Sequence, residues 1–186
     1  SVGKIFTDRL KISPQGIEWK ESTWTLDTIT RIRWGGVRRS VNGIPTGTTY
    51  SVYFGSETNF TGINLSKSQY NKFVDCLWKA VGVNILTNTL KGLQSGKQYV
   101  FGTTEINDEG IVLEKYNFFS ANEKRYFRWS ELVLWNDPGC FCIGPKDKKF
   151  RASFSYLDHD NIHILETALR ALWQNYSPKL SSLLGR

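Results

Sequence analysis

Two cysteines and two histidines in the last third of the chain have spacings that could hold a metal ion. Cys140 and Cys142 are separated by one residue, so a strand there would point both thiols to one face. His159 and His163 are four residues apart, which would place both imidazoles on one face of a helix. Two cysteines and two histidines form a formal zinc set. However, structural sites usually have two or more residues between their cysteines, and free cysteines often pack as small apolar side chains. We therefore expect no metal and no cofactor, and we keep a structural zinc site at these four residues as an alternative.

Sequence patterns of catalysis are missing. The chain contains no Gly-x-Ser-x-Gly turn, no Gly-x-x-x-x-Gly-Lys-Ser/Thr loop and no Gly-x-Gly-x-x-Gly pattern. Its carboxylates are scattered: Asp158 and Asp160 flank His159, and Asp108-Glu109 fall in an expected turn. Capping and turn preferences explain these positions without chemistry. We expect that the protein is not an enzyme.

Positive charge is concentrated in the first half of the sequence. The 186 residues carry 24 Lys and Arg against 17 Asp and Glu, a net charge of +7. Residues 1–94 hold 12 basic and 6 acidic residues, whereas residues 95–186 hold 12 and 11. A basic surface favours an anionic partner, such as an acidic protein, a phospholipid surface or a nucleic acid.

The densest basic stretch runs from Arg31 to Thr48. Arginine suits bidentate contacts to carboxylates and stacking on aromatic rings, and the turn-forming pair Asn42-Gly43 favours a protruding hairpin or loop. The predicted binding residues are Arg31, Arg33, Trp34, Arg38, Arg39 and Asn42. The alternative is a solvated strand face whose charges protect a sheet edge.

A smaller basic patch follows Gly144-Pro145. It consists of Lys146, Lys148, Lys149 and Arg151, in an expected hairpin loop. Charged loop tips commonly serve solubility, and this explanation is favoured over a second binding surface.

The elements that would position these residues form an internal repeat. Ile12 to Trp19 resembles Ile106 to Leu113, each a strand, a turn ending in glycine and a second strand. Each half then continues with short strands and closes with an amphipathic helix. We predict a first unit over residues 1–94 with a long helix over about 68–93, capped by Ser66 or Ser68. A second unit over 95–178 and a tail over 179–186 follow. The fold class is α+β, mostly β.

This repeated pattern resembles the pleckstrin-homology superfold, in particular its short GRAM and bacterial PH-like forms. The resemblance implies two tandem barrels or sandwiches, each closed by its C-terminal helix. In lipid-binding members, basic residues surround the loop between the first two strands. Here Ser13–Gly16 is flanked only by Lys11 and Lys20, and Asn107–Gly110 is acidic, so inositide recognition is not expected. The residue pattern of three segments, Arg33–Gly36, Ser40–Thr48 and Asn107–Ile111, also resembles C-terminal regions of bacterial DnaJ-like proteins. The chain has no His-Pro-Asp tripeptide, which J-domains carry.

Together these patterns predict a non-catalytic protein-interaction or scaffold module of a larger bacterial protein. It would bind an acidic protein partner through the Arg31–Thr48 segment. The alternative is peripheral binding to an anionic phospholipid membrane. Sequence-specific nucleic acid binding is not expected, because no recognised nucleic-acid-binding motif is present. No apolar run approaches the roughly 20 residues of a transmembrane helix, so we expect a cytoplasmic protein, free or peripheral to the membrane.

Overall fold

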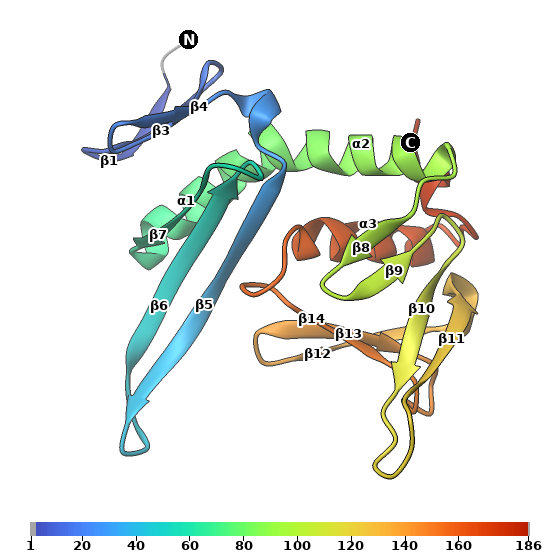
Figure 1. Cartoon of the computed structure of the whole chain (residues 1–186). Helices are drawn as coiled ribbons and strands as arrows, with labels where there is room; N and C mark the ends of the chain where they lie inside the picture. Colours follow the sequence, from blue (N-terminus) through green and yellow to red (C-terminus); the bar gives the residue numbers. More distant parts are fainter. Residues whose placement is uncertain (1–2, 186) are drawn as a thin grey trace. The chain divides into compact units, whose positions relative to one another are not determined.

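The structure, a computed structural model, describes residues 3–185 and divides into two compact units, Ser1–Ile85 and Leu86–Arg186. The fold is α+β and consists mostly of strands in four antiparallel sheets (Figure 1). Within residues 3–185, none of these sheets closes into a barrel. Both units have the same order of elements: a four-stranded sheet, a three-stranded sheet and then a helical segment.

The first unit begins with two sheets in which sequential strands pair. The four-stranded sheet comprises β1 (Lys4–Thr7), β2 (Leu10–Ser13), β3 (Gly16–Trp19) and β4 (Ser22–Trp24). After a 3₁₀ turn at Leu26–Thr28, the three-stranded sheet comprises β5 (Arg31–Val41), β6 (Ile44–Gly55) and β7 (Phe60–Leu65). Edge-to-face aromatic contacts join the parts of this unit: Trp24 packs on Phe54, and Phe6 packs on Phe73 of the helix.

The helical segment that follows is continuous but changes its winding. It comprises α1 (Lys67–Leu77), a π-helical turn (Trp78–Gly82) and α2 (Val83–Gln94). The hydroxyl of Ser66 accepts a hydrogen bond from the N–H of Gln69 (3.3 Å), so the predicted cap at this residue is confirmed.

The division between the units falls within this helical segment, not after residue 94 as the sequence analysis places it. The reason is the apolar register of α2. Leu90 and Leu93 are buried in the core of the second unit, and Leu86 packs against it.

The second unit repeats the order, with shorter strands in its three-stranded sheet. Its four-stranded sheet comprises β8 (Tyr99–Phe101), β9 (Thr104–Ile106), β10 (Gly110–Lys115) and β11 (Glu123–Arg128). A 3₁₀ turn (Trp129–Glu131) leads to β12 (Val133–Asp137), β13 (Cys140–Gly144) and β14 (Ala152–Ser155), then to α3 (Ile162–Gln174). Its core contains the fully buried side chains of Trp129, Phe141, Phe154 and Leu169.

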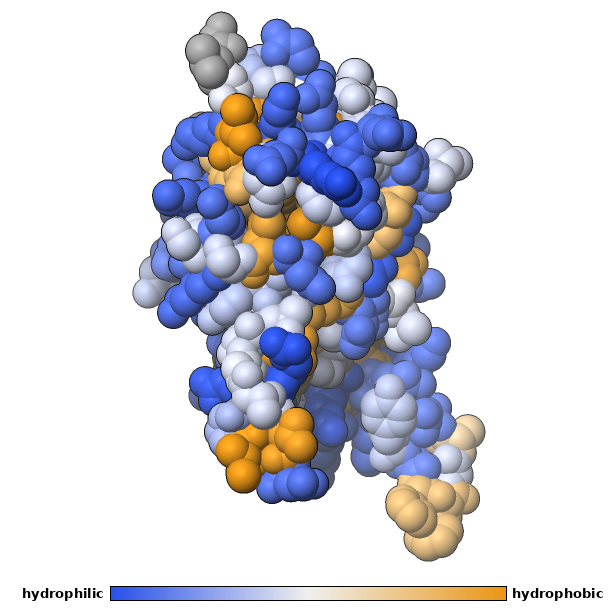
Figure 2. All heavy atoms as spheres, turned by 90° about the vertical axis from the view of Figure 1, so that its left-hand side faces the viewer, coloured by the Kyte–Doolittle hydropathy of each residue, from blue (hydrophilic) through white to orange (hydrophobic). Residues whose placement is uncertain are grey.

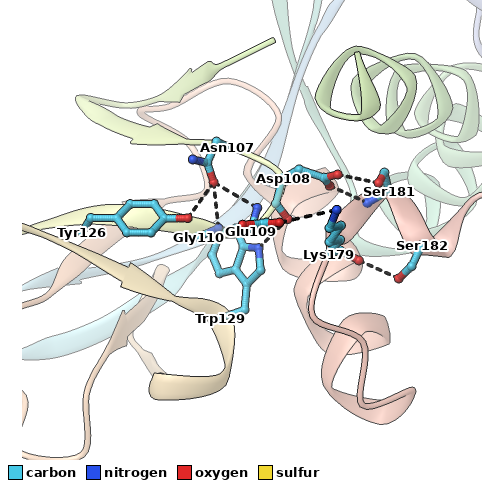
Figure 3. A network of polar contacts seen from close by, with 9 residues as sticks. All are labelled: Asn107, Asp108, Glu109, Gly110, Tyr126, Trp129, Lys179, Ser181 and Ser182. Atoms are coloured by element: carbon cyan, nitrogen blue, oxygen red, sulfur yellow. Dashed lines mark hydrogen bonds and ion pairs between the residues drawn. The ribbon is translucent and has the colours of Figure 1, made fainter. Parts of the chain in front are cut away.

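Residues 179–186, which the sequence analysis predicts as a tail, include a 3₁₀ turn (Leu180–Leu183) that packs on the second unit. Leu180 is buried in the core, and its N–H donates to the main-chain oxygen of Asp108 (3.0 Å). The carboxylate of Asp108 accepts hydrogen bonds from both the N–H (2.7 Å) and the hydroxyl of Ser181 (Figure 3). The prediction of a separate tail is wrong for the described residues, because a buried leucine and a carboxylate attach this segment to the β9–β10 turn.

Candidate interaction surface

The Arg31–Thr48 segment forms most of a long two-stranded hairpin. β5 and β6 pair from Arg31 opposite Gly55 to Val41 opposite Ile44, and Asn42-Gly43 form the turn (Figure 1). Both turn residues have positive φ, 51° and 78°, which is the backbone that a two-residue hairpin turn of the I′ type requires. The pairing shifts between Arg39 and Ser40, so the hairpin contains a bulge near its end.

Trp34 lies on the core side of this hairpin. Like Ile32, which has the same side-chain direction, it is buried, with 8 % of its surface exposed. Its ring meets that of Trp78 edge to face, with 6.4 Å between ring centres. The sequence analysis predicts Trp34 as a binding residue, but its side chain packs in the core of the first unit.

Arg31 and Arg33 lie on the opposite face, over an aromatic side chain of β7. The guanidinium carbon of Arg31 is 3.9 Å from the ring centre of Phe60, and that of Arg33 is 5.2 Å away. Phe60 in turn stacks on Tyr53, with 6.0 Å between ring centres. Both arginines are half-buried, so through these cation–π contacts they also stabilise the sheet. The sequence analysis did not predict this structural role.

The outer part of the hairpin has a different character. Residues 36–47 are all exposed, and Arg38 and Arg39 point to opposite faces because they are adjacent on one strand. Three aliphatic side chains accompany them: Val37, Val41 and Ile44 are 48 %, 59 % and 68 % exposed. Figure 2 shows a hydrophobic patch at the end of the hairpin, where the register places Val41 and Ile44. We define the hairpin tip as residues 36–47.

The register gives the order of these side chains along the tip. Val41 and Ile44 are directly opposite and flank the turn. Arg38 and Arg39 lie three and two residues before Val41, which at a rise of about 3.4 Å per residue places them about 7–10 Å further back. The hairpin therefore ends in the apolar side chains of Val41 and Ile44, and the cationic side chains of Arg38 and Arg39 lie behind them. Sequence reasoning noted the arginines but missed the aliphatic residues, whose signal is the pair Val41 and Ile44 on either side of the Asn42-Gly43 turn.

The residues of the second basic patch, in and beside the loop between β13 and β14, make separate local contacts. The ammonium of Lys148 lies 4.6 Å from the ring centre of Trp135, and the N–H of Lys149 donates to the carboxylate of Asp147 (2.9 Å). Arg151 lines a cleft of about 240 Å³ together with Lys124, Glu105 and Glu114. Basic and acidic groups alternate there, and Lys146 is exposed in the loop, so no purely cationic site forms among these residues.

The four residues of the formal zinc set do not form one group. α3 begins at Ile162, and Asn161 has a φ of 61°, so His159 precedes the helix and does not share a face with His163. The Nδ1 atom of His159 accepts a hydrogen bond from the N–H of Ser155 (3.2 Å), and the His163 ring stacks on Tyr156 at 4.4 Å. The four-residue zinc site, kept as an alternative in the sequence analysis, is therefore not assembled. Cys140 and Cys142 do share a face of the sheet, where Asp137 joins them.

The second unit also exposes two aromatic residues that the sequence analysis passed over. Phe118 and Phe119, in the loop between β10 and β11, are 96 % and 97 % exposed. The nearest charged residues are Glu114 and Lys115 on one side and Glu123 and Lys124 on the other. Since these charges balance, the loop has no excess of positive charge like that of the hairpin tip.

No family model, curated protein or solved structure gives a significant match to the chain. Among residues 3–185, no helix has the length and apolar character needed to cross a bilayer. The geometry of the described residues is therefore the basis for a functional assignment.

Proposed function

We propose that this chain is a non-catalytic module that attaches to an anionic membrane surface through the hairpin tip. The proposal depends on one observation, the order of apolar and cationic side chains along the hairpin tip. Val41 and Ile44 flank the turn, and Arg38 and Arg39 follow about 7–10 Å behind Val41 along the strand. Peripheral segments bury apolar side chains about 5–10 Å into the boundary between headgroups and acyl chains, with cations held at the headgroups. The tip has this arrangement.

The same geometry favours a membrane over the acidic protein surface that the sequence analysis ranks first. An acidic surface would pair with Arg38 and Arg39 but would give no reason for aliphatic side chains at the outermost position. A narrow two-stranded tip can enter a fluid interface without a preformed pocket, whereas a protein partner would need a matching groove. Residues 28–56 contain no acidic residue that would oppose an anionic surface.

We also propose that each unit is a PH-like domain. The repeated order of a four-stranded sheet, a three-stranded sheet and a closing helical segment supports this. The loop that is basic in lipid-binding relatives of that family is not basic here, so the attachment proposed for this chain uses the later β5–β6 hairpin instead.

Co-sedimentation with phospholipid vesicles tests the attachment. We expect the chain to bind vesicles that contain phosphatidylserine, to bind neutral phosphatidylcholine vesicles much less, and to dissociate as salt increases. Each arginine near an anionic surface contributes about 1 kcal/mol, so the Arg38→Ala plus Arg39→Ala variant should bind about 30-fold more weakly. The Val41→Ser plus Ile44→Ser variant should lose at least about tenfold, since each buried methylene contributes about 0.8 kcal/mol.

The matched control is Lys146→Ala plus Lys149→Ala, which removes the same charge from the loop of the second unit and should change binding far less. Equal losses in both charge variants would mean that net charge alone drives binding, and would overturn the proposal. Binding that depends on the arginines but not on Val41 and Ile44 would reject insertion and leave only electrostatic attachment at the headgroups. A chain that does not bind phosphatidylserine vesicles at low salt is not a membrane module of this kind.

A further inference from the structure

The outer face of the three-stranded sheet in the second unit brings together three metal-ligating side chains. Cys140 and Cys142 point to the same face because side chains on a strand alternate. The two-residue turn Pro138-Gly139 places Asp137 directly opposite Cys140 in the β12–β13 hairpin. The register of one short hairpin is therefore sufficient to gather two sulfur atoms and a carboxylate.

The distances suit a small tetrahedral ion. One ligand atom from each of these residues lies within 4.8 Å of the other two, and the Cys142 sulfur is 3.4 Å from the Asp137 carboxylate. Zinc bonds of about 2.3 Å to sulfur and 2.0 Å to oxygen give sulfur–oxygen edges of about 3.5 Å and sulfur–sulfur edges of about 3.8 Å.

Polar and aromatic side chains both lie on this face, where Trp135 is directly opposite Cys142. The Ser153 hydroxyl lies 3.5 Å from the sulfur atoms of both Cys140 and Cys142. Cys142 is buried, Cys140 is half-buried and Asp137 is exposed, so an ion would enter from the aspartate side. The two thiols, one buried and one half-buried, do not belong to the apolar core cluster, which uses Phe141 and Ile143 on the other face of the same strand.

We infer that Asp137, Cys140 and Cys142 form a binding site for Zn²⁺, with two sulfur ligands, one oxygen ligand and a fourth position open to water. Soft sulfur ligands select zinc over magnesium or calcium, which prefer oxygen ligands. Three protein ligands and an open position distinguish this site from closed structural sites with four ligands. The site does not use His159 or His163.

Titration of the reduced full chain with Co²⁺, a spectroscopic substitute for Zn²⁺, tests the inference. We expect one Co²⁺ per chain, with the sulfur-to-cobalt absorption in the near ultraviolet and the visible bands of tetrahedral Co²⁺, and with both displaced by Zn²⁺. Cys140→Ser and Asp137→Asn should each weaken binding at least about tenfold. Cys76→Ser and His159→Ala are the controls and should bind as the unchanged chain does, since neither residue belongs to the proposed site.

Alkylation followed by mass spectrometry keeps the test independent of any variant. Zn²⁺ should protect Cys140 and Cys142 from alkylation and leave Cys76 equally reactive. Absence of the sulfur-to-cobalt absorption, or its persistence in Cys140→Ser, would overturn the inference. Reduced chain that shows no protection by Zn²⁺ but readily forms a Cys140–Cys142 disulfide on oxidation would identify a redox pair instead of a metal site.

Discussion

The Asp108 carboxylate should contribute a large share of the stability of the second unit. It accepts hydrogen bonds from the N–H and the hydroxyl of Ser181, a residue that is 7 % exposed (Figure 3). Hydrogen bonds to a charged group contribute about 1.5–3 kcal/mol each, and a buried donor left unpaired costs about 1–3 kcal/mol. Asp108→Ala removes both acceptors but leaves the main-chain oxygen that Leu180 and Trp129 use. We therefore expect the free energy of unfolding to fall by about 3 kcal/mol.

Equilibrium unfolding in urea measures this loss, and amide hydrogen exchange at Leu180–Leu183 locates it. Asp108→Asn keeps one acceptor oxygen and should lose about half as much. The matched control is Asp147→Ala, whose carboxylate accepts one N–H in an exposed turn (2.9 Å) and should cost about 1 kcal/mol or less. If Asp108→Ala cost no more than this control, or if exchange at Leu180–Leu183 were unchanged, the segment after residue 178 would not be attached as described.

Two further predictions concern the first unit. Burial and the neighbouring Tyr50 raise the pKa of Tyr70 to about 12. The unfolded chain loses this proton first, near pH 10, so the free energy of unfolding should fall as pH rises from about 10 to 12. Tyr70→Phe should show a smaller fall in alkaline urea titrations, and an identical fall would contradict this origin. Gly82→Ala should destabilise the chain although alanine favours helices, because the new methyl group would lie 2.6 Å from the Trp78 ring. Asn84→Ala, at an exposed helical position, is the control, and stabilisation by both changes in thermal unfolding would refute the steric argument.

Patterns of local origin could be predicted from the sequence. The α+β class followed from turn residues and periodicity, and the cap at Ser66 from its side chain. The alternation of Arg31 and Arg33 with Ile32 and Trp34 also holds in β5. Each of these depends on residues within a few positions of one another.

Features that depend on distant partners could not be predicted. The sequence places Trp34 among arginines and suggests a binding residue. In the structure its ring packs against Trp78 of the helical segment, which is distant in the sequence. The attachment of Ser181 requires Asp108, which is 73 residues earlier in the chain. His159 and His163 have helical spacing, but the positive φ of Asn161 starts the helix after His159. Spacing alone does not show where a helix begins.

A comparison of the corresponding hairpins of the two units shows why the hairpin tip is the stronger functional candidate. β12 and β13 pair over five residues each, and the hairpin ends where its contribution to the core ends. β5 and β6 continue for 11 and 12 residues, and from Gly36 to Gly47 every residue is exposed. An exposed extension gains little from burial and still incurs the entropy of ordering its backbone, about 1–2 kcal/mol per residue. The fold does not require this segment, so its length and its apolar end are best explained by a surface that covers it.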